Sequence, residues 1–160
     1  MAHIELSASI RRSVEEIAAF LTDFRNHPEF LPKERFRRFE FGDGSKADSF
    51  SAEIHLLGRW FPVTWTNAGS PESGCIVQEG RGRFAVKTTW RMDPLRPDRR
   101  GPRTAVRLDV EYKPPGGPLG RLLDIAVLRS EMLKLYDQIM RRLPIVLEGP
   151  PKSGLKLEEP

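Results

Sequence analysis

Residues 103–143 have the sequence RTAVRLDVEYKPPGGPLGRLLDIAVLRSEMLKLYDQIMRRL, which joins a strand pattern to a helix pattern. From Val106 to Tyr112, apolar side chains alternate with charged ones, the two-residue period of a strand that buries one face. Two prolines and two glycines then end the strand, and a third proline suits the first turn of a helix. From residue 119 to about residue 143, apolar side chains recur at helical spacing, and Pro144 is expected to kink or end the helix.

The N-terminal part predicts one more strand and two short helices. Residues 3–10 alternate between polar and apolar side chains, as a half-buried strand does. Ser13 and Glu16 have the spacing of a capping box, so a helix is expected to begin there and to run to about Asp23. Pro28 and Pro32 bracket a short segment with room for one further helical turn.

The middle of the chain predicts a series of strands joined by short connections. We expect residues 69–74 to form a loop, and residues 94–102 to form an exposed hairpin loop because their prolines cannot donate to a sheet. Consecutive strands with short connections predict an antiparallel sheet, and helices placed before and after it predict an α+β fold. The expected strands are residues 39–41, 50–56, 60–67, 75–79 and 83–92.

The composition is that of a globular domain. The chain has 160 residues, of which 39% are hydrophobic and 30% charged, and this excludes a collagen-like or wholly disordered chain. We expect one domain over residues 1–148 and a mobile tail over residues 149–160, which have little apolar content. The N-terminus carries no apolar signal region, and no run of about 18 apolar residues could span a bilayer, so a cytoplasmic location is expected.

The sequence favours neither a metal site nor a disulfide. Cys75 is the one cysteine, which excludes an intramolecular disulfide framework and a cysteine-rich zinc module. The three histidines, His3, His27 and His55, lie far apart and show no short metal-ligand spacing. The glycine pairs are too short for a dinucleotide-binding motif. We therefore expect no metal and no cofactor.

The order of these elements resembles the START-like superfamily, also called SRPBCC or Bet v 1-like, and in particular its polyketide cyclase/dehydrase and lipid transport branch. The short second helix of the family commonly carries a tryptophan, whereas here His27 or Phe30 stands nearby. The resemblance covers about residues 3–148. It rests on four segments, residues 4–24, 28–32, 90–94 and 103–124.

The resemblance implies a helix-grip fold. In this fold a seven-stranded antiparallel sheet wraps around a long C-terminal helix, and two short helices follow the first strand. It also implies a cavity between the sheet and the helix that takes lipids, isoprenoids, sterols or polyketides. The residues expected to line this cavity are Phe50, Ile54, Trp65, Trp90, Leu108, Tyr112, Ala126, Met132 and Tyr136.

Four residues are candidates for catalysis, namely Glu53, His55, Arg91 and Tyr112. Cyclisation of a poly-ketone needs a proton acceptor near an acidic methylene and a donor for the enolate oxygen. Strand alternation places Glu53 and His55 opposite the apolar face, and Arg91 opposite Trp90, so these three side chains are expected to face solvent. Tyr112 is in the apolar phase of its strand and is expected to point inward.

The net charge of +4 raises the question of an anionic partner. Four arginines of the expected hairpin loop, Arg96, Arg99, Arg100 and Arg103, are a candidate surface for weak contact with an anionic membrane. Acidic residues are interspersed along the whole chain, so nucleic acid is not favoured as a partner.

Three functions follow as hypotheses. The first is binding of a small hydrophobic or amphipathic molecule for carriage or sequestration, because the architecture forms a cavity but lacks a convergent set of ionisable residues. The second is a polyketide cyclase or aromatase that acts on a bound poly-ketone. The third is a protein-interaction module.

Overall fold

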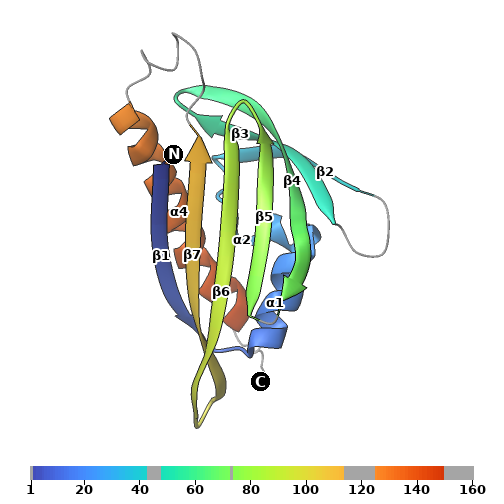
Figure 1. The fold of residues 1–160 in the computed structure, drawn as a ribbon, viewed down its shortest axis with the longest axis vertical. Coiled ribbons are helices and arrows are strands. Elements are labelled where there is room, and N and C mark those ends of the chain that lie inside the picture. The colour runs from blue at the N-terminus through green and yellow to red at the C-terminus, as the bar shows by residue number, and fades with distance from the viewer. Residues whose placement is uncertain (1, 43–47, 73, 114–124, 150–160) are drawn as a thin grey trace, which may run out of the picture.

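A computed structural model describes residues 2–42, 48–72, 74–113 and 125–149, which form one curved sheet and several helices (Figure 1). In chain order these are β1 (Ala2–Ile10), α1 (Val14–Thr22), η1 (Phe24–Asn26), α2 (His27–Phe30), β2 (Phe36–Phe41), β3 (Ser49–Leu56), β4 (Arg59–Glu72), β5 (Cys75–Gly82), β6 (Ala85–Asp98), β7 (Gly101–Lys113) and α4 (Ile125–Glu148).

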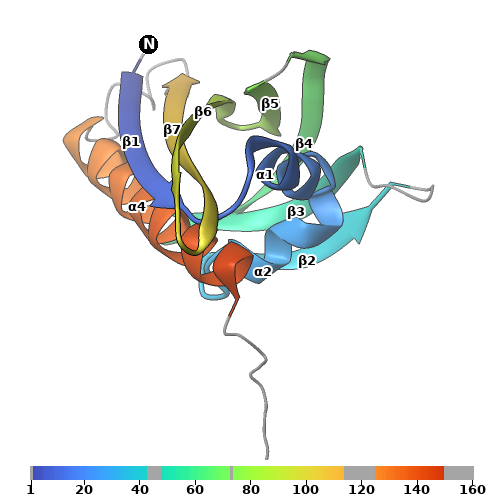
Figure 2. The same cartoon turned by 90° about the horizontal axis from the view of Figure 1, so that it is seen from below.

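The sheet has seven antiparallel strands in the order β1-β7-β6-β5-β4-β3-β2. Every neighbouring pair except β1 and β7 is consecutive in sequence. The first strand pairs with the last, with Ile4 opposite Val110, and this pairing brings the two ends of the sheet sequence together. The sheet bends strongly enough for β2 and β3 to face α4 from the other side (Figure 2). The seven-stranded α+β helix-grip prediction is confirmed.

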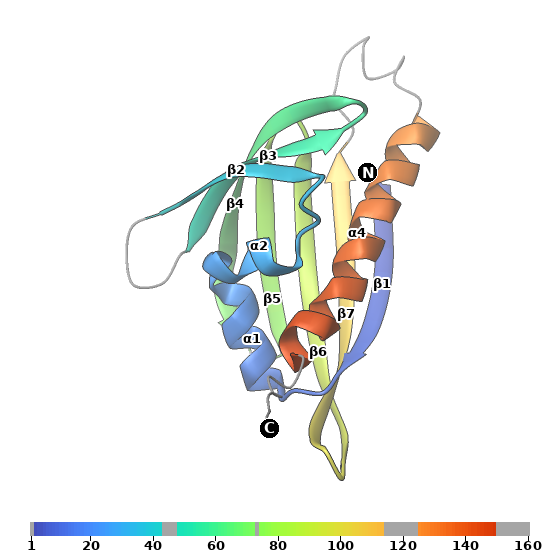
Figure 3. The same cartoon turned by 180° about the vertical axis from the view of Figure 1, so that it is seen from behind.

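The helix α4 crosses the concave side of the sheet, beside β1, and its C-terminal part lies near α2 (Figure 3). Its buried side chains follow one stripe that packs on the apolar faces of the strands. α1 and η1 also contribute to this core, through the buried residues Ile17, Leu21 and Phe24. The stripe of α4 consists of Leu128, Met132, Leu135, Tyr136, Ile139, Met140 and Leu143.

The capping box at the start of α1 is confirmed. The Glu16 amide donates to Ser13 Oγ at 3.1 Å, and the Ser13 amide donates to the Glu16 carboxylate at 3.2 Å. The helix ends at Thr22, and the side chain of Asp23 then accepts the amide of Arg25 to begin η1. These local bonds turn the chain between α1 and α2.

Both expected loops are shorter than predicted, because the strands continue through them. β4 runs to Glu72, which pairs with Cys75, and β6 continues through Pro94, which pairs with Thr104. The amide of Met92 donates toward β5, to the carbonyl of Gly74, so position 94 faces the same side, where β5 has ended. Pro94 therefore removes no bond from the sheet, and the hairpin projects beyond the other strands (Figure 1).

Of the two outcomes expected at Pro144, a kink or an end of the last helix, the end is wrong, since α4 continues to Glu148. Leu143 is fully buried, and the Arg12 side chain donates to the carbonyl of Glu148 at 3.1 Å. The Arg11 amide also donates to the Glu148 carboxylate. These contacts hold the last turn in place despite the backbone bond that proline removes. The expected beginning of this helix, near residue 119, lies outside the described residues.

Candidate functional site

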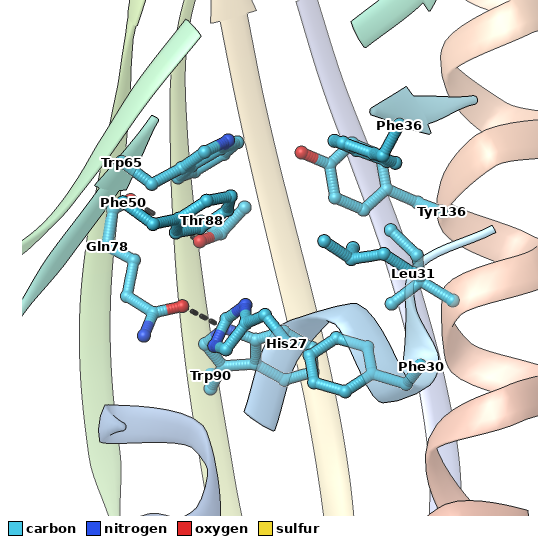
Figure 4. Close-up of a pocket in the computed structure, with 11 residues that line it drawn as sticks. His27, Phe30, Leu31, Phe36, Phe50, Trp65, Gln78, Thr88, Trp90 and Tyr136 are labelled. Carbon is cyan, nitrogen blue, oxygen red and sulfur yellow. Dashed lines mark hydrogen bonds between the residues drawn. The ribbon is translucent and has the colours of Figure 1, made fainter. Parts of the chain in front are cut away.

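A small cavity lies between the sheet and α4, with a volume of about 30 Å³, room for about two water molecules (Figure 4). Its polar residues are His27, Gln78 and Thr88, and Leu31 and Ile139 complete the wall. Most of the lining is aromatic, from Phe30, Phe36, Phe50, Trp65, Trp90 and Tyr136.

A second cavity of about 20 Å³ adjoins the first and is lined by apolar residues such as Ile54, Phe84 and Met132. Trp65 and Tyr136 line both cavities, so these two side chains form the boundary between them. Gly80 makes room for the indole of Trp65, because a Cβ at this position would lie 2.8 Å from the ring. Trp65 on β4 and Tyr136 on α4 thus approach the boundary from opposite walls.

Gln78 organises most of the polar groups of the first cavity. Its side-chain amide donates to the carbonyl of Leu21 at 2.8 Å and to Asn67 Oδ1 at 3.0 Å. Its side-chain oxygen accepts the indole N–H of Trp90 at 3.2 Å, and its backbone carbonyl accepts the hydroxyl of Thr88. The network satisfies these buried groups and fastens the end of α1 to the sheet.

His27 is buried and is held in one tautomer. Its Nε2 lies 2.9 Å from the carbonyl of Leu21, which can only accept, so Nε2 carries the proton and Nδ1 is left as an acceptor. Burial lowers the pKa of His27 to about 4, with smaller opposing effects from the Leu21 carbonyl and Asp23. At neutral pH the imidazole is therefore uncharged.

Two hydrogen-bond donors at the cavity boundary have no hydrogen-bond partner within the described part of the chain. They are the hydroxyl of Tyr136 and the indole N–H of Trp65, both on buried side chains. Burial raises the pKa of the Tyr136 phenol, so the hydroxyl keeps its proton at neutral pH. In Figure 4 the phenol oxygen and the indole nitrogen both point into the space between the two rings.

Several of the residues expected to line a cavity lie together. Phe50, Trp65, Trp90 and Tyr136 line the first cavity, and Ile54 and Met132 line the second together with Trp65 and Tyr136. The other three expected residues, Leu108, Tyr112 and Ala126, contribute to neither lining.

Two of these three are buried on β7, and one lies outside the core. Leu108 and Tyr112 face inward but pack elsewhere in the core. Ala126 is exposed, contrary to the expectation, because the buried stripe of α4 begins at Leu128 and position 126 falls on the opposite side of the helix.

The catalytic candidates do not converge. Glu53 lies outside the core and is 2.7 Å from Arg37, and the His55 ring packs beside Trp60. Arg91 is also on the outer face, 3.5 Å from Asp109. As expected, the fourth candidate, Tyr112, points inward, and its hydroxyl has no partner among the residues described.

The sequence analysis did not identify seven residues of the first cavity lining, and two of them, Gln78 and Thr88, carry a readable signal in the sequence. The seven are His27, Phe30, Leu31, Phe36, Gln78, Thr88 and Ile139. Gln78 and Thr88 are polar residues at positions where their strands otherwise bury apolar side chains or glycine. Gln78 lies between Ile76 and Gly80 on the inner face of β5, and Thr88 lies between Val86 and Trp90 on that of β6. Such a position indicates an internal polar network. Leu31 and Ile139 show no comparable signal, because an apolar residue of the core and one of a cavity wall look alike in sequence.

The arginines of the β6–β7 hairpin give no support to a membrane contact. Asp98 lies 2.6 Å from Arg11 and 3.7 Å from Arg103, so part of the positive charge is paired. Within the described ranges, none of the helices is long and apolar enough to cross a membrane. The same residues contain no group of three histidine, cysteine or acidic side chains that could hold a metal ion.

Solved structures with this fold cover nearly the whole chain. A START superfamily protein from Mycobacterium smegmatis is 19% identical, with a TM-score of 0.60 over 91% of this chain and 97% of that chain. The Zhui aromatase/cyclase from Streptomyces sp. R1128 is 12% identical, with a TM-score of 0.68 over 95% of both chains. A protein from Thermus thermophilus is 14% identical, with a TM-score of 0.67 over 92% of this chain and 97% of that chain. At these identities the structures show the fold alone.

Sequence comparison identifies the family. A search of curated proteins finds no match. The family model described as polyketide cyclase / dehydrase and lipid transport matches residues 1–148, which agrees with the resemblance read from the sequence. The chain therefore belongs to the polyketide cyclase / dehydrase and lipid transport family.

Proposed function

We propose that this protein binds a small hydrophobic or amphipathic molecule between the sheet and α4, and carries or sequesters it without changing its bonds. The observation that supports this proposal is the pair of adjoining cavities with aromatic and aliphatic walls. Sites for small apolar molecules are concave and apolar, with a few polar groups that fix orientation.

A cyclase or aromatase is the alternative, favoured by the family description and by the likeness to an aromatase/cyclase. This chemistry needs a base beside the bound chain. Glu53, His55 and Arg91 lie on the outer face, away from both cavities. His27 lines the first cavity, but a pKa of about 4 makes it a weak base at neutral pH. The balance of the site therefore favours binding.

The two cavities are much smaller than a ligand. Pockets for drug-sized molecules measure about 300–1,000 Å³, against about 30 and 20 Å³ here. Binding must therefore move the boundary residues Trp65 and Tyr136 and widen the space between the sheet and α4. We expect slow association and a measurable change in the fluorescence of Trp65 when a ligand enters.

The proposal is tested with the intact chain purified from its own host. Native mass spectrometry with organic extraction is expected to find a co-purifying apolar molecule. Titration with the neutral fluorophore N-phenyl-1-naphthylamine then measures the capacity of the emptied protein. Ile139→Phe, which fills the first cavity, should weaken fluorophore binding about tenfold or more.

A matched control lies on the same helix. Leu133 is 42% exposed, so Leu133→Phe adds the same aromatic ring outside the core and should leave binding unchanged. Equal effects of the two substitutions, or no binding of the fluorophore by the parent protein, would contradict the proposal. Turnover of an extracted poly-ketone by the purified protein would favour the cyclase.

A further inference from the structure

The free hydrogen-bonding groups of the cavity define what a ligand must offer. Gln78 and Thr88 are already satisfied within the protein, and so is the indole N–H of Trp90. Nδ1 of His27 remains as an acceptor, and donors without a partner in the described chain remain at Trp65 and Tyr136. A buried donor without an acceptor costs free energy, so a ligand that supplies the acceptor gains affinity.

The two donors face a common space. The Trp65 ring packs against Gly80 on the sheet side, and Tyr136 projects from α4 on the other. Each lines both cavities, and Figure 4 shows their polar atoms directed between the rings. One oxygen atom with two lone pairs can accept from both donors at once.

The cavity walls carry no charged side chain. Neither lining, as the structure describes it, includes a lysine, arginine, aspartate or glutamate, and His27 is uncharged at neutral pH. A carboxylate or phosphate moved into this space would lose its hydration and find no opposite charge, which is far more costly than burying a neutral carbonyl.

We infer that Trp65 and Tyr136 select an uncharged apolar molecule that places a carbonyl oxygen between their two donors, and that the cavity rejects carboxylates and phosphates. This inference rests on the proposed binding function. It narrows the ligand class to neutral ketones, aldehydes or esters, and it assigns two specificity-determining residues.

Three probes with the same ring skeleton test separately the effect of a carbonyl group and the effect of a charge on binding. They are 1-tetralone, which has a carbonyl, tetralin, which has no acceptor, and 1,2,3,4-tetrahydro-1-naphthoate, which is charged. Calorimetric titration of the full chain is expected to rank 1-tetralone above tetralin by about tenfold, since each neutral hydrogen bond contributes a few-fold. The carboxylate should bind more weakly than both.

The indole N–H resonances provide a readout that does not depend on affinity. The protein has three tryptophans, so nitrogen-15 spectra contain three such signals. Tetralone should shift the Trp65 signal downfield, whereas tetralin should not, because only the ketone accepts a hydrogen bond. The signal is assigned with Trp65→Phe.

Two tyrosine substitutions form a matched pair. Tyr136→Phe should abolish most of the preference for tetralone over tetralin. Tyr112→Phe also removes a buried hydroxyl without a described partner, but Tyr112 lines neither cavity, so the preference should persist. If all variants show the same preference, or if the carboxylate binds best, the inference is wrong although the binding function stands. If none of the three probes nor N-phenyl-1-naphthylamine binds, the proposed function itself fails.

Discussion

At the scale of single residues, His27 links stability to pH. Its pKa is about 4 in the folded protein and 6.5 in a solvated chain, so the unfolded state takes up a proton first as the pH falls. Stability from the neutral imidazole is therefore complete above pH 6.5 and is lost as the pH falls toward 4. The full loss is about 3 kcal/mol, from the relation between a pKa shift and free energy.

Urea unfolding at several pH values between about 7 and 4 measures this loss. His27→Gln keeps an amide that can donate to Leu21 but cannot titrate, so its free energy of unfolding should decline less over this window than that of the parent. His55→Gln removes a histidine on the outer face, where the ring packs on Trp60, and should keep the parent's decline. Equal pH profiles for His27→Gln and the parent would show that His27 is not the source.

Tyr112 allows a second prediction at this scale. Its hydroxyl is buried and has no hydrogen-bond partner in the described part of the chain. Removing an unsatisfied buried hydroxyl relieves a desolvation penalty, so Tyr112→Phe should raise the free energy of unfolding by about 1 kcal/mol. A decrease of that size in chemical denaturation would mean that the hydroxyl is bonded.

The residue scale also shows how far the sequence predicts the site. Inward-facing aromatic residues such as Phe50, Trp65 and Trp90 follow from strand alternation, which is a local rule. The partner of each donor does not follow, because Gln78 meets Leu21 only through the tertiary fold. Some aromatic residues pack in the core and others border a cavity. This difference depends on distances between side chains that are far apart in sequence, which a local sequence pattern does not give.

At the scale of elements, the β3–β4 turn depends on α4. Leu57 and Gly58 both have positive φ, 54° and 74°, as a two-residue type I′ turn requires, although leucine rarely adopts this conformation. The Glu131 carboxylate accepts the amide of Leu57 at 2.9 and 3.0 Å and pairs with Arg35 at 3.0 Å. Arg35 also donates to the carbonyl of His55. One carboxylate on the helix thus holds the turn and the segment before β2.

Glu131→Ala should therefore destabilise the protein by about 2 kcal/mol, because it removes charge-assisted hydrogen bonds to partly buried partners. Hydrogen exchange should increase at Leu57 and in the ends of β3 and β4. Asp137→Ala on the same helix breaks an exposed pair with Arg141 of 2.8 Å and should cost less than about 0.5 kcal/mol. Unchanged exchange at Leu57 in the Glu131 variant would contradict this role.

The misjudged boundaries also belong to this scale, and both involve proline. Pro94 and Pro144 were expected to interrupt their elements, since proline lacks an amide donor. The sheet has no neighbouring strand on the side that Pro94 faces within the described residues. The Arg12 side chain and the Arg11 amide, both in the β1–α1 connection, donate to Glu148 at the end of α4. Both exceptions arise from segments distant in sequence, so a local rule could not anticipate them.

At the scale of the whole molecule, the sheet and the helices together enclose the cavity. The Arg142 side chain donates to the carbonyls of Phe30 and Glu29 and so connects α4 to α2. Glu131 connects α4 to the β3–β4 turn, and Glu148 connects it to the segment between β1 and α1. A ligand that widens the space between sheet and helix must strain or break these hydrogen bonds. Binding is therefore coupled to a movement of α4 relative to the rest of the domain.

A substitution at Gly80 tests whether the position of the Trp65 ring controls the space between the sheet and α4. A methyl group at Gly80 would lie 2.8 Å from the indole, so Gly80→Ala must displace the ring toward Tyr136 and into the boundary between the cavities. Overpacking of this kind costs about 1–3 kcal/mol in stability, and we expect fluorophore affinity to fall about tenfold. Gly58→Ala is the control, because its positive φ of 74° also makes alanine unfavourable while no atom lies within 4 Å of the added methyl group. Comparable affinity loss in both variants would trace the effect to stability; a loss confined to Gly80→Ala would tie ligand capacity to the placement of one indole ring.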